Sequence, residues 1–123
     1  MKKLFLVCLM MLAGSAWAEW VTIGDYGEVT FYFDPATIRK DRNMRRVWEI
    51  QDLNERIKSG AMSLRMRVEY DCKQERFRYL EISSHSEPMA FGRVLELDGE
   101  DENWGEIAPN TAVDRMLQIV CSK

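Results

Sequence analysis

Strict alternation of apolar and polar residues marks one segment of this chain as a β-strand. Apolar side chains occupy every second position from Met62 to Tyr70, with serine, arginine and glutamate between them. Side chains alternate between the two faces of a strand, so this pattern predicts a strand with one buried face and one exposed face. Cys72 continues the apolar parity, and we expect its sulfur on the buried side.

Further runs rich in β-branched, aromatic and aliphatic residues predict five more strands, at 20–23, 29–33, 47–53, 76–84 and 91–97. The run 76–84 has a mixed pattern. Phe77 and Tyr79 fall on one face, whereas Leu80 and Ile82 fall on the other. Apolar residues on both faces are typical of a strand inside a sheet.

The C-terminal segment has helical rather than strand periodicity. Thr111 and Asp114 are spaced as in a capping box, and Thr111 directly precedes the apolar run. The apolar residues that recur at three-to-four spacing are Ala112, Val113, Met116, Leu117, Val120 and Cys121. A shorter helical turn is expected at 35–38, where Asp34 can cap and Pro35 can occupy the first position. The expected fold class is α+β, an antiparallel sheet of about six strands with a C-terminal helix packed on it.

Residues 1–18 have the pattern of a secretory signal peptide, with two lysines, an apolar run and a small-residue exit at Ala18. The apolar run is shorter than the roughly 20 residues that span a bilayer, so no membrane anchor is expected after cleavage at Ala18. Cys8 lies inside that run, not at a cleavage point, so no lipid anchor is expected either. The rest, 19–123, is long enough for one domain and too short for two.

Cys72 and Cys121 are the two cysteines that remain after the signal peptide is removed. An even pair in an exported chain predicts one structural disulfide. Since Cys72 follows a strand and Cys121 ends the helix, the bond should join helix to sheet.

Charge patterning suggests one candidate surface. The chain has a formal net charge of −3, which argues against a nucleic-acid partner. Its most basic segment is 39–46, and the candidate partner-binding residues there are Arg39, Lys40, Arg42, Arg45 and Arg46. Such a patch can steer an acidic partner or a polyanionic glycan. The alternative is a solvated hairpin whose charges protect a sheet edge.

Two further arginine pairs, Arg65/Arg67 and Arg76/Arg78, should face each other across one hairpin. They either extend the basic patch or are balanced by the neighbouring acids, which are Glu69, Asp71 and Glu81. The sequence leaves both options open.

Catalytic and metal sites are not indicated. His85 is the only histidine, and its polar surroundings predict a solvated loop residue, not a base paired with a nucleophile. The acidic run 98–102 lacks the spacing of a calcium loop, and no cysteine–histidine cluster suits zinc. We therefore expect no catalytic residue, no metal and no cofactor.

The order of several short motifs resembles the surface-adhesin protein E family over residues 20–121. The motifs are Trp20-Val21-x-Ile23-Gly24, Phe31-Tyr32-x-Asp34-Pro35, Glu69-Tyr70-Asp71-Cys72, Arg76-Phe77-Arg78 and Ile119-Val120-Cys121. The resemblance implies a six-stranded antiparallel sheet, a C-terminal helix and one disulfide. It also implies adhesion to host extracellular-matrix and serum proteins. The family's adhesin carries a lipid anchor, whereas this chain lacks a lipid-modified cysteine.

The leading functional hypothesis is an exported, non-enzymatic binding protein, in the periplasm or at the cell surface. Its partner would be a host matrix or serum protein, or an envelope protein, held at an exposed sheet edge or at the basic hairpin. The alternative is a periplasmic inhibitor of a cell-wall enzyme such as lysozyme, whose basic surface the acidic run 98–102 would suit. A structural role in the envelope, with no distinct ligand, is a third possibility.

Overall fold

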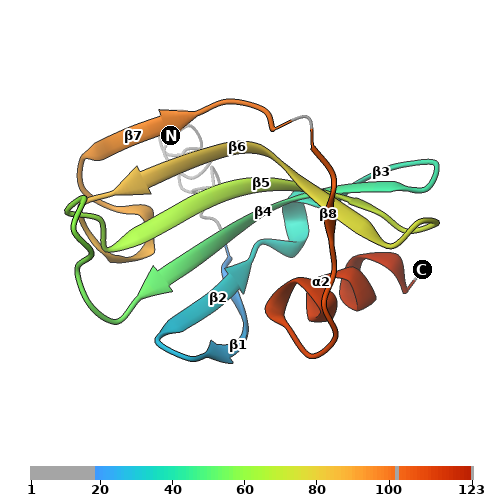
Figure 1. Cartoon of the computed structure of the whole chain (residues 1–123), viewed down its shortest axis with the longest axis horizontal. Helices are drawn as coiled ribbons and strands as arrows, with labels where there is room; N and C mark the ends of the chain where they lie inside the picture. The colour runs from blue at the N-terminus through green and yellow to red at the C-terminus, as the bar shows by residue number, and fades with distance from the viewer. Residues whose placement is uncertain (1–18, 102, 123) are drawn as a thin grey trace, which may run out of the picture.

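The alternating pattern folds into one antiparallel sheet of eight strands (Figure 1). The computed structural model describes residues 19–101 and 103–122. The predicted signal peptide 1–18, with Cys8 and the cleavage site after Ala18, lies outside the described residues. The predicted α+β class, with a C-terminal helix, is confirmed.

Six strands form the continuous sheet in the order β1-β2-β4-β5-β6-β7. They are β1 (Val21–Tyr26), β2 (Val29–Phe33), β4 (Met44–Leu53), β5 (Ser63–Asp71), β6 (Arg76–His85) and β7 (Val94–Asp98). Two short strands were not predicted. β3 (Arg39–Asp41) pairs with β4, and β8 (Gly105–Glu106) pairs with β6. The predicted basic segment is therefore a β3–β4 hairpin, and its second strand starts at Met44, three residues earlier than expected.

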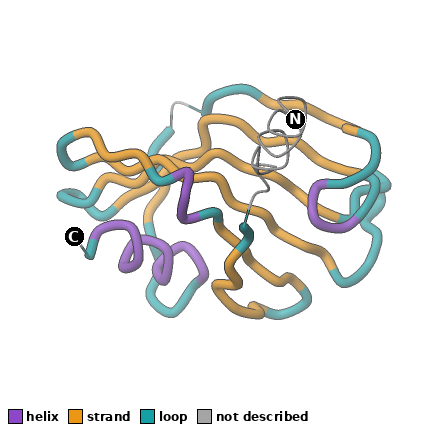
Figure 2. The backbone as a smooth tube through the Cα atoms, turned by 180° about the vertical axis from the view of Figure 1, so that it is seen from behind, coloured by secondary structure: helices purple, strands orange, loops and turns teal. Residues whose placement is uncertain are grey.

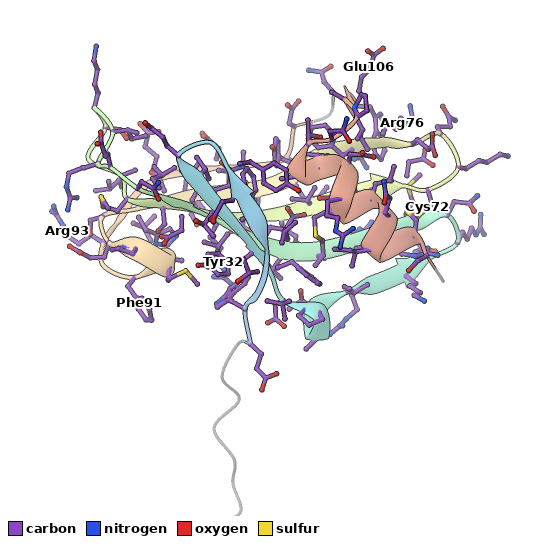
Figure 3. All side chains as sticks on the ribbon, turned by 90° about the horizontal axis from the view of Figure 1, so that it is seen from below. Tyr32, Cys72, Arg76, Phe91, Arg93 and Glu106 are labelled. Carbon is purple, nitrogen blue, oxygen red and sulfur yellow. A yellow bond between two sulfur atoms is a disulfide. The ribbon has the colours of Figure 1, made fainter. Side chains whose placement is uncertain are left out.

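Helix α2 (Ala112–Cys121) covers one face of the sheet, which we call the inner face (Figures 1 and 3). Thr111 caps the helix, because its side chain accepts a hydrogen bond from the backbone N–H of Asp114. The buried core residues of sheet and helix are Phe33, Val47, Met66, Val68, Tyr70, Met116, Leu117 and Val120. The predicted disulfide is confirmed, since Cys72 after β5 is bonded to Cys121 at the end of α2.

The inner face also buries a carboxyl group. Glu49 of β4 is 5 % exposed and lies across from Phe33 and Met66 on the neighbouring strands. The hydroxyl of buried Tyr70 donates a hydrogen bond to it over 2.5 Å. Burial raises the pKa of Glu49 to about 8, and the Tyr70 hydrogen bond only partly opposes that rise.

A β-bulge in β6 overturns one prediction about facing. Val68 pairs with Tyr79 but Arg67 pairs with Glu81, which leaves Leu80 as an extra residue. The bulge shifts the alternation, so Ile82 returns to the inner face and packs on the core with Phe77 and Tyr79. The expectation that Ile82 faces away from them was wrong, because it assumed an unbroken period of two.

Two single-turn helices flank the opposite face of the sheet, which we call the outer face (Figure 2). The turn η1 (Pro35–Thr37) precedes β3, and Asp34 caps it as predicted by accepting from the backbone N–H of Ala36. The turn η2 (Pro88–Ala90) packs on β4 and β5 at the other end. Backbone N–H groups of η2 donate to Asp52 and Ser63, which fixes the turn to the sheet.

Candidate functional site: an arginine–tryptophan face

The outer face between the two turns carries arginine and tryptophan side chains on adjacent strands. Alternation places one residue in two of each strand on this face, and the strand register aligns them in rows. We call this set the arginine–tryptophan face; it consists of Arg46 and Trp48 of β4, Arg65 and Arg67 of β5, Arg76 and Arg78 of β6, and Trp104 before β8.

A buried glutamate holds one row of this face together. Arg46, Glu69 and Arg78 lie opposite one another on three strands. Arg46 Nε donates to one Glu69 oxygen over 2.7 Å, and Arg78 donates to the other over 2.7–2.8 Å. Burial alone would raise the pKa of Glu69, but hydrogen bonds from the two arginines outweigh it and lower that pKa. Glu69 therefore stays ionised and fixes both guanidinium groups.

The next row is organised around Trp104 and Asp71. Asp71 accepts from Arg76 Nε over 3.0 Å and from the backbone N–H groups of Lys73 and Gln74. The indole of Trp104 lies against both neighbouring guanidinium groups, 4.3 Å from that of Arg76 and 4.5 Å from that of Arg78. These are cation–π distances, so Trp104 holds the two arginines at the edge of the sheet.

Trp48 of β4 lies beside arginine side chains that are not ion-paired. The guanidinium of Arg65 is 4.2 Å from the centre of its ring. Arg67 lies opposite Trp48 in the register. In the part of the chain that the structure describes, neither Arg65 nor Arg67 has a carboxylate within ion-pair distance. Positive charge therefore concentrates beside Trp48.

Apolar side chains continue the outer face beyond Arg65. Leu97 of β7 lies across from Ser83, and Val94 lies across from His85. Both are more than half exposed, and Phe91 next to η2 is 68 % exposed (Figure 3). β7 is thus an exposed edge strand of the sheet, and its apolar side chains lie on the same face as the arginines.

The structure divides the predicted partner-binding residues between the two faces. Arg39, Lys40 and Arg42 are exposed on the β3–β4 hairpin, and Arg46 belongs to the arginine–tryptophan face. Arg45 points the other way. Its Nε donates to the backbone oxygen of Val120 over 3.1 Å. Arg45 therefore stabilises the C-terminal end of α2, and the binding role predicted for these five residues stays a prediction.

The arginine pairs of β5 and β6 share the outer face, but they do not lie directly opposite each other. Arg76 lies across from Asp71 and Arg78 across from Glu69. The sequence left open whether these arginines are balanced by acids or extend the basic patch. In the structure, Arg76 and Arg78 of β6 form ion pairs, whereas Arg65 and Arg67 of β5 form none with the described residues and extend the positive surface.

His85 is not the solvated loop residue that we predicted. It ends β6, is 6 % exposed, and its Nε2 lies 2.8 Å from Ser83 Oγ. Burial, together with the charge of Arg65, lowers its pKa. Within the described residues Nδ1 has no hydrogen-bond partner, so nothing orients the imidazole as a catalytic base would require.

The acidic run is exposed at 98–101, and Glu102 lies outside the described residues. Glu100 lies 3.9 Å from Arg78. Over 19–101 and 103–122, no group of three or more histidine, cysteine, aspartate or glutamate residues is arranged to hold a metal ion. In the same ranges, no helix has the length and apolar character needed to cross a membrane. The inhibitor hypothesis stays a prediction.

Sequence reasoning missed Trp48, Arg67 and Trp104 as parts of one surface. The available signal was the spacing of two within each strand. Arg46 and Trp48 are two positions apart, as are the two arginines in each of the next two strands, so each pair shares one face of its strand. Trp104 offered no such signal, since β8 is two residues long and the pairing that places it is not visible in the sequence.

Comparisons with known proteins agree with this fold. A family model described as surface-adhesin protein E matches residues 20–122. One solved structure of Haemophilus influenzae protein E superposes with a TM-score of 0.68 at 15 % identity, covering 90 % of this chain and 91 % of that one. A second crystal form gives 0.65 at 15 % identity, covering 87 % and 97 %. Among curated proteins, none matches this chain significantly. The family match spans nearly all of the described residues, and the chain belongs to the surface-adhesin protein E family.

Proposed function

We propose that this protein is an exported binding protein that holds a protein partner on its arginine–tryptophan face. The partner is a host matrix or serum protein, or an envelope protein, reached from the periplasm or the cell surface after removal of residues 1–18. The family, one of surface adhesins, supports a binding role. The observation that carries the proposal is the ordered array of Arg46, Trp48, Arg65 and Arg67 on an outer face that no helix longer than one turn covers in the described residues.

The composition of this face suits recognition of a protein. Tryptophan and arginine are the residues most enriched among those that dominate binding energies at interfaces. Arg46 and Arg78 are held by Glu69, and Trp104 is held by two arginines, so these side chains lose little conformational freedom on binding. Exposed apolar groups at Val94 and Leu97 extend the same surface.

The charge of the face indicates the kind of partner. Beside Trp48, Arg65 and Arg67 form no ion pair with any residue that the structure describes. The whole chain has a net charge of −3, so this part of the face is locally opposite in sign to the chain as a whole. Such a surface steers acidic partners and repels basic ones.

Capture from extracts tests the proposal. The protein is immobilised and exposed to envelope and host-matrix extracts, and retained proteins are identified by mass spectrometry. Arg67→Glu should abolish capture of the partner, because it places a negative charge beside Trp48. The matched control is Arg115→Glu, at an exposed position of α2 on the other side of the sheet, which should capture as the unchanged protein does.

Far-ultraviolet circular dichroism establishes that both variants fold. Equal capture by folded Arg67→Glu and by the unchanged protein would show that the partner binds elsewhere. A partner that dissociates at moderate salt from the unchanged protein, where exposed charges are screened, would agree with a charged interface.

A further inference from the structure

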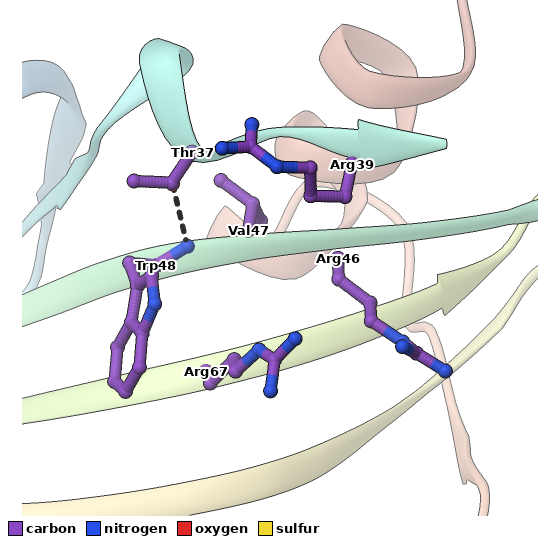
Figure 4. A pocket seen from close by; sticks show the side chains of 6 residues that line it. All are labelled: Thr37, Arg39, Arg46, Val47, Trp48 and Arg67. Atoms are coloured by element: carbon purple, nitrogen blue, oxygen red, sulfur yellow. Dashed lines mark hydrogen bonds between the residues drawn. The ribbon is translucent and has the colours of Figure 1, made fainter. Parts of the chain in front are cut away.

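A pocket of about 270 Å³ opens on the arginine–tryptophan face between η1, β3, β4 and β5 (Figure 4). Its lining residues are Thr37, Arg39, Arg46, Val47, Trp48 and Arg67. One wall is formed by the indole of Trp48, whereas the side chain of Val47 points to the core on the inner face. The remaining wall carries three guanidinium groups from three different strands. The volume suits one side chain of a bound partner.

Two of the three arginines are fixed by contacts within the protein. Arg46 is bound by Glu69, which is nearly inaccessible to solvent. Arg39 donates to the backbone oxygens of Ala36 and Ile38 over 3.0 and 3.1 Å, so η1 holds it at the rim. Thr37 Oγ1 accepts from the backbone N–H of Trp48, which ties η1 to the same pocket (Figure 4).

The third arginine, Arg67, lies across from Glu81 in the strand register but not within ion-pair distance of it. Arg67 forms no ion pair with any residue that the structure describes. Arg39 and Arg46 also lie directly across from each other, a like-charge pairing that destabilises a sheet. Glu69, which binds Arg46, is shared with Arg78. The pocket therefore has an excess of positive charge that a bound anion would neutralise.

We propose that this pocket binds the carboxylate of an acidic side chain in an extended segment of the partner. The inference rests on the proposed function and names the chemistry of its central contact. The planar guanidinium of Arg67 matches a carboxylate in a two-bond geometry. The methylene stem of a glutamate packs against Trp48, as long side chains do on apolar surfaces.

The spacing of the arginines favours an extended acidic peptide over an isolated anion. Arg65 and Arg67 are two positions apart on β5, so their Cα atoms are separated by roughly 6.5 Å. Alternate side chains of an extended peptide have the same separation. A segment with acidic residues at every second position therefore places one carboxylate in the pocket and the next beside Arg65.

Nuclear magnetic resonance of the arginine side chains tests this inference directly. The probe is the pentapeptide Glu-Ser-Glu-Ser-Glu, titrated at constant ionic strength into the full chain labelled with ¹⁵N. The Nε–Hε signal of Arg67 and the indole N–H signal of Trp48 should shift, and that of Arg115 should not. The peptide Lys-Ser-Lys-Ser-Lys is the charge-reversed control and should shift neither signal.

A variant gives the magnitude. Arg67→Gln should weaken the affinity for the acidic pentapeptide roughly tenfold or more, because a hydrogen-bonded charged pair is lost. Arg115→Gln removes the same charge from α2 and should leave the affinity unchanged. Equal weakening by both variants would reduce the effect to net charge and overturn the proposal.

The remaining outcomes separate this inference from the proposed function. If the pentapeptide shifts no signal of the pocket while Arg67→Glu still abolishes capture of a protein, the pocket chemistry is wrong and the binding face stands. If the pentapeptide binds as described but no protein is captured, the proposed function fails and the pocket stands. If a sulfated oligosaccharide shifts Arg67 and the pentapeptide does not, the ligand is a glycan and the peptide proposal is overturned.

Discussion

Replacing Glu49 with glutamine measures the energetic effect of burying a carboxyl group in the core. Glu49 is enclosed between Phe33 and Met66 of the adjacent strands, with the Tyr70 hydroxyl as its hydrogen-bond donor. Glutamine has nearly the same shape and keeps an oxygen for Tyr70, but it cannot ionise. The substitution therefore removes the titration while keeping the size of the side chain and an acceptor for Tyr70.

The expected magnitude follows from the pKa of Glu49, which burial raises from 4.5 to about 8. The folded protein keeps a proton that the unfolded chain releases between these two values. The free energy of unfolding therefore falls as pH rises through this window. Each pKa unit corresponds to about 1.4 kcal/mol, so the full shift amounts to about 5 kcal/mol, most of which falls between pH 5 and pH 8.

The glutamine variant should lose this dependence. Its buried amide N–H groups gain no acceptor, which lowers stability by about 1–3 kcal/mol at every pH. The informative quantity is therefore the difference in unfolding free energy between variant and unchanged protein, followed across pH. That difference should move in favour of the variant by about 3–4 kcal/mol from pH 5 to pH 8. The contribution of His85, whose pKa burial lowers, is present in both proteins and cancels.

Urea denaturation followed by circular dichroism at pH 5, 6, 7 and 8 gives these free energies. Glu96→Gln, at an exposed position of β7, is the matched control and should give a difference that does not change with pH. A Glu49→Gln difference that stays constant within about 1 kcal/mol from pH 5 to pH 8 would refute the reasoning, since a carboxyl group with an ordinary pKa contributes little slope there.

Two further predictions concern the attachment of α2. Replacing both Cys72 and Cys121 with serine should lower the unfolding free energy by about 4 kcal/mol, because the bond closes a loop with a sequence separation of 49. Calorimetry of the variant, and of the unchanged protein with and without reductant, measures this loss. A loss under about 1 kcal/mol would contradict the loop-closure argument. Arg45→Met should lower the unfolding free energy by about 1–2 kcal/mol, because the backbone oxygen of Val120 loses a charged donor. The control Arg115→Met should change it by less than about 0.5 kcal/mol. Equal effects of the two variants in urea titrations would show that Arg45 contributes nothing specific to the end of α2.

The parts of the fold that the sequence predicted are those in which local pattern and tertiary environment agree. β5 keeps strict alternation because one of its faces packs on α2, and α2 keeps a helical apolar stripe for the same reason. The disulfide was predictable because removal of the signal peptide leaves two cysteines. Burial of Glu49 was not predictable, because a glutamate in a strand indicates a solvent-facing position. The contact with Tyr70 of the neighbouring strand, which satisfies the carboxyl group, is visible only in the structure.

The candidate site was predictable only in part. The arginine-rich character of 39–46 was visible, but alternation sends Arg45 to the inner face and Arg46 to the outer face. Trp104 joins the site through the long-range pairing of β8 with β6, which no local pattern encodes. His85 was misassigned because its polar neighbours suggested a loop, whereas β6 continues through it and β7 pairs with it.

The extra residue Leu80 reverses the alternation of side chains between the two faces of β6. Before it, odd-numbered residues such as Tyr79 face inward; after it, even-numbered residues such as Ile82 do. Removing Leu80 would leave every pairing with β5 in place, whereas removing a residue inside β6 but away from the bulge would turn part of the strand inside out. Length differences among relatives in this strand should therefore fall at the bulge.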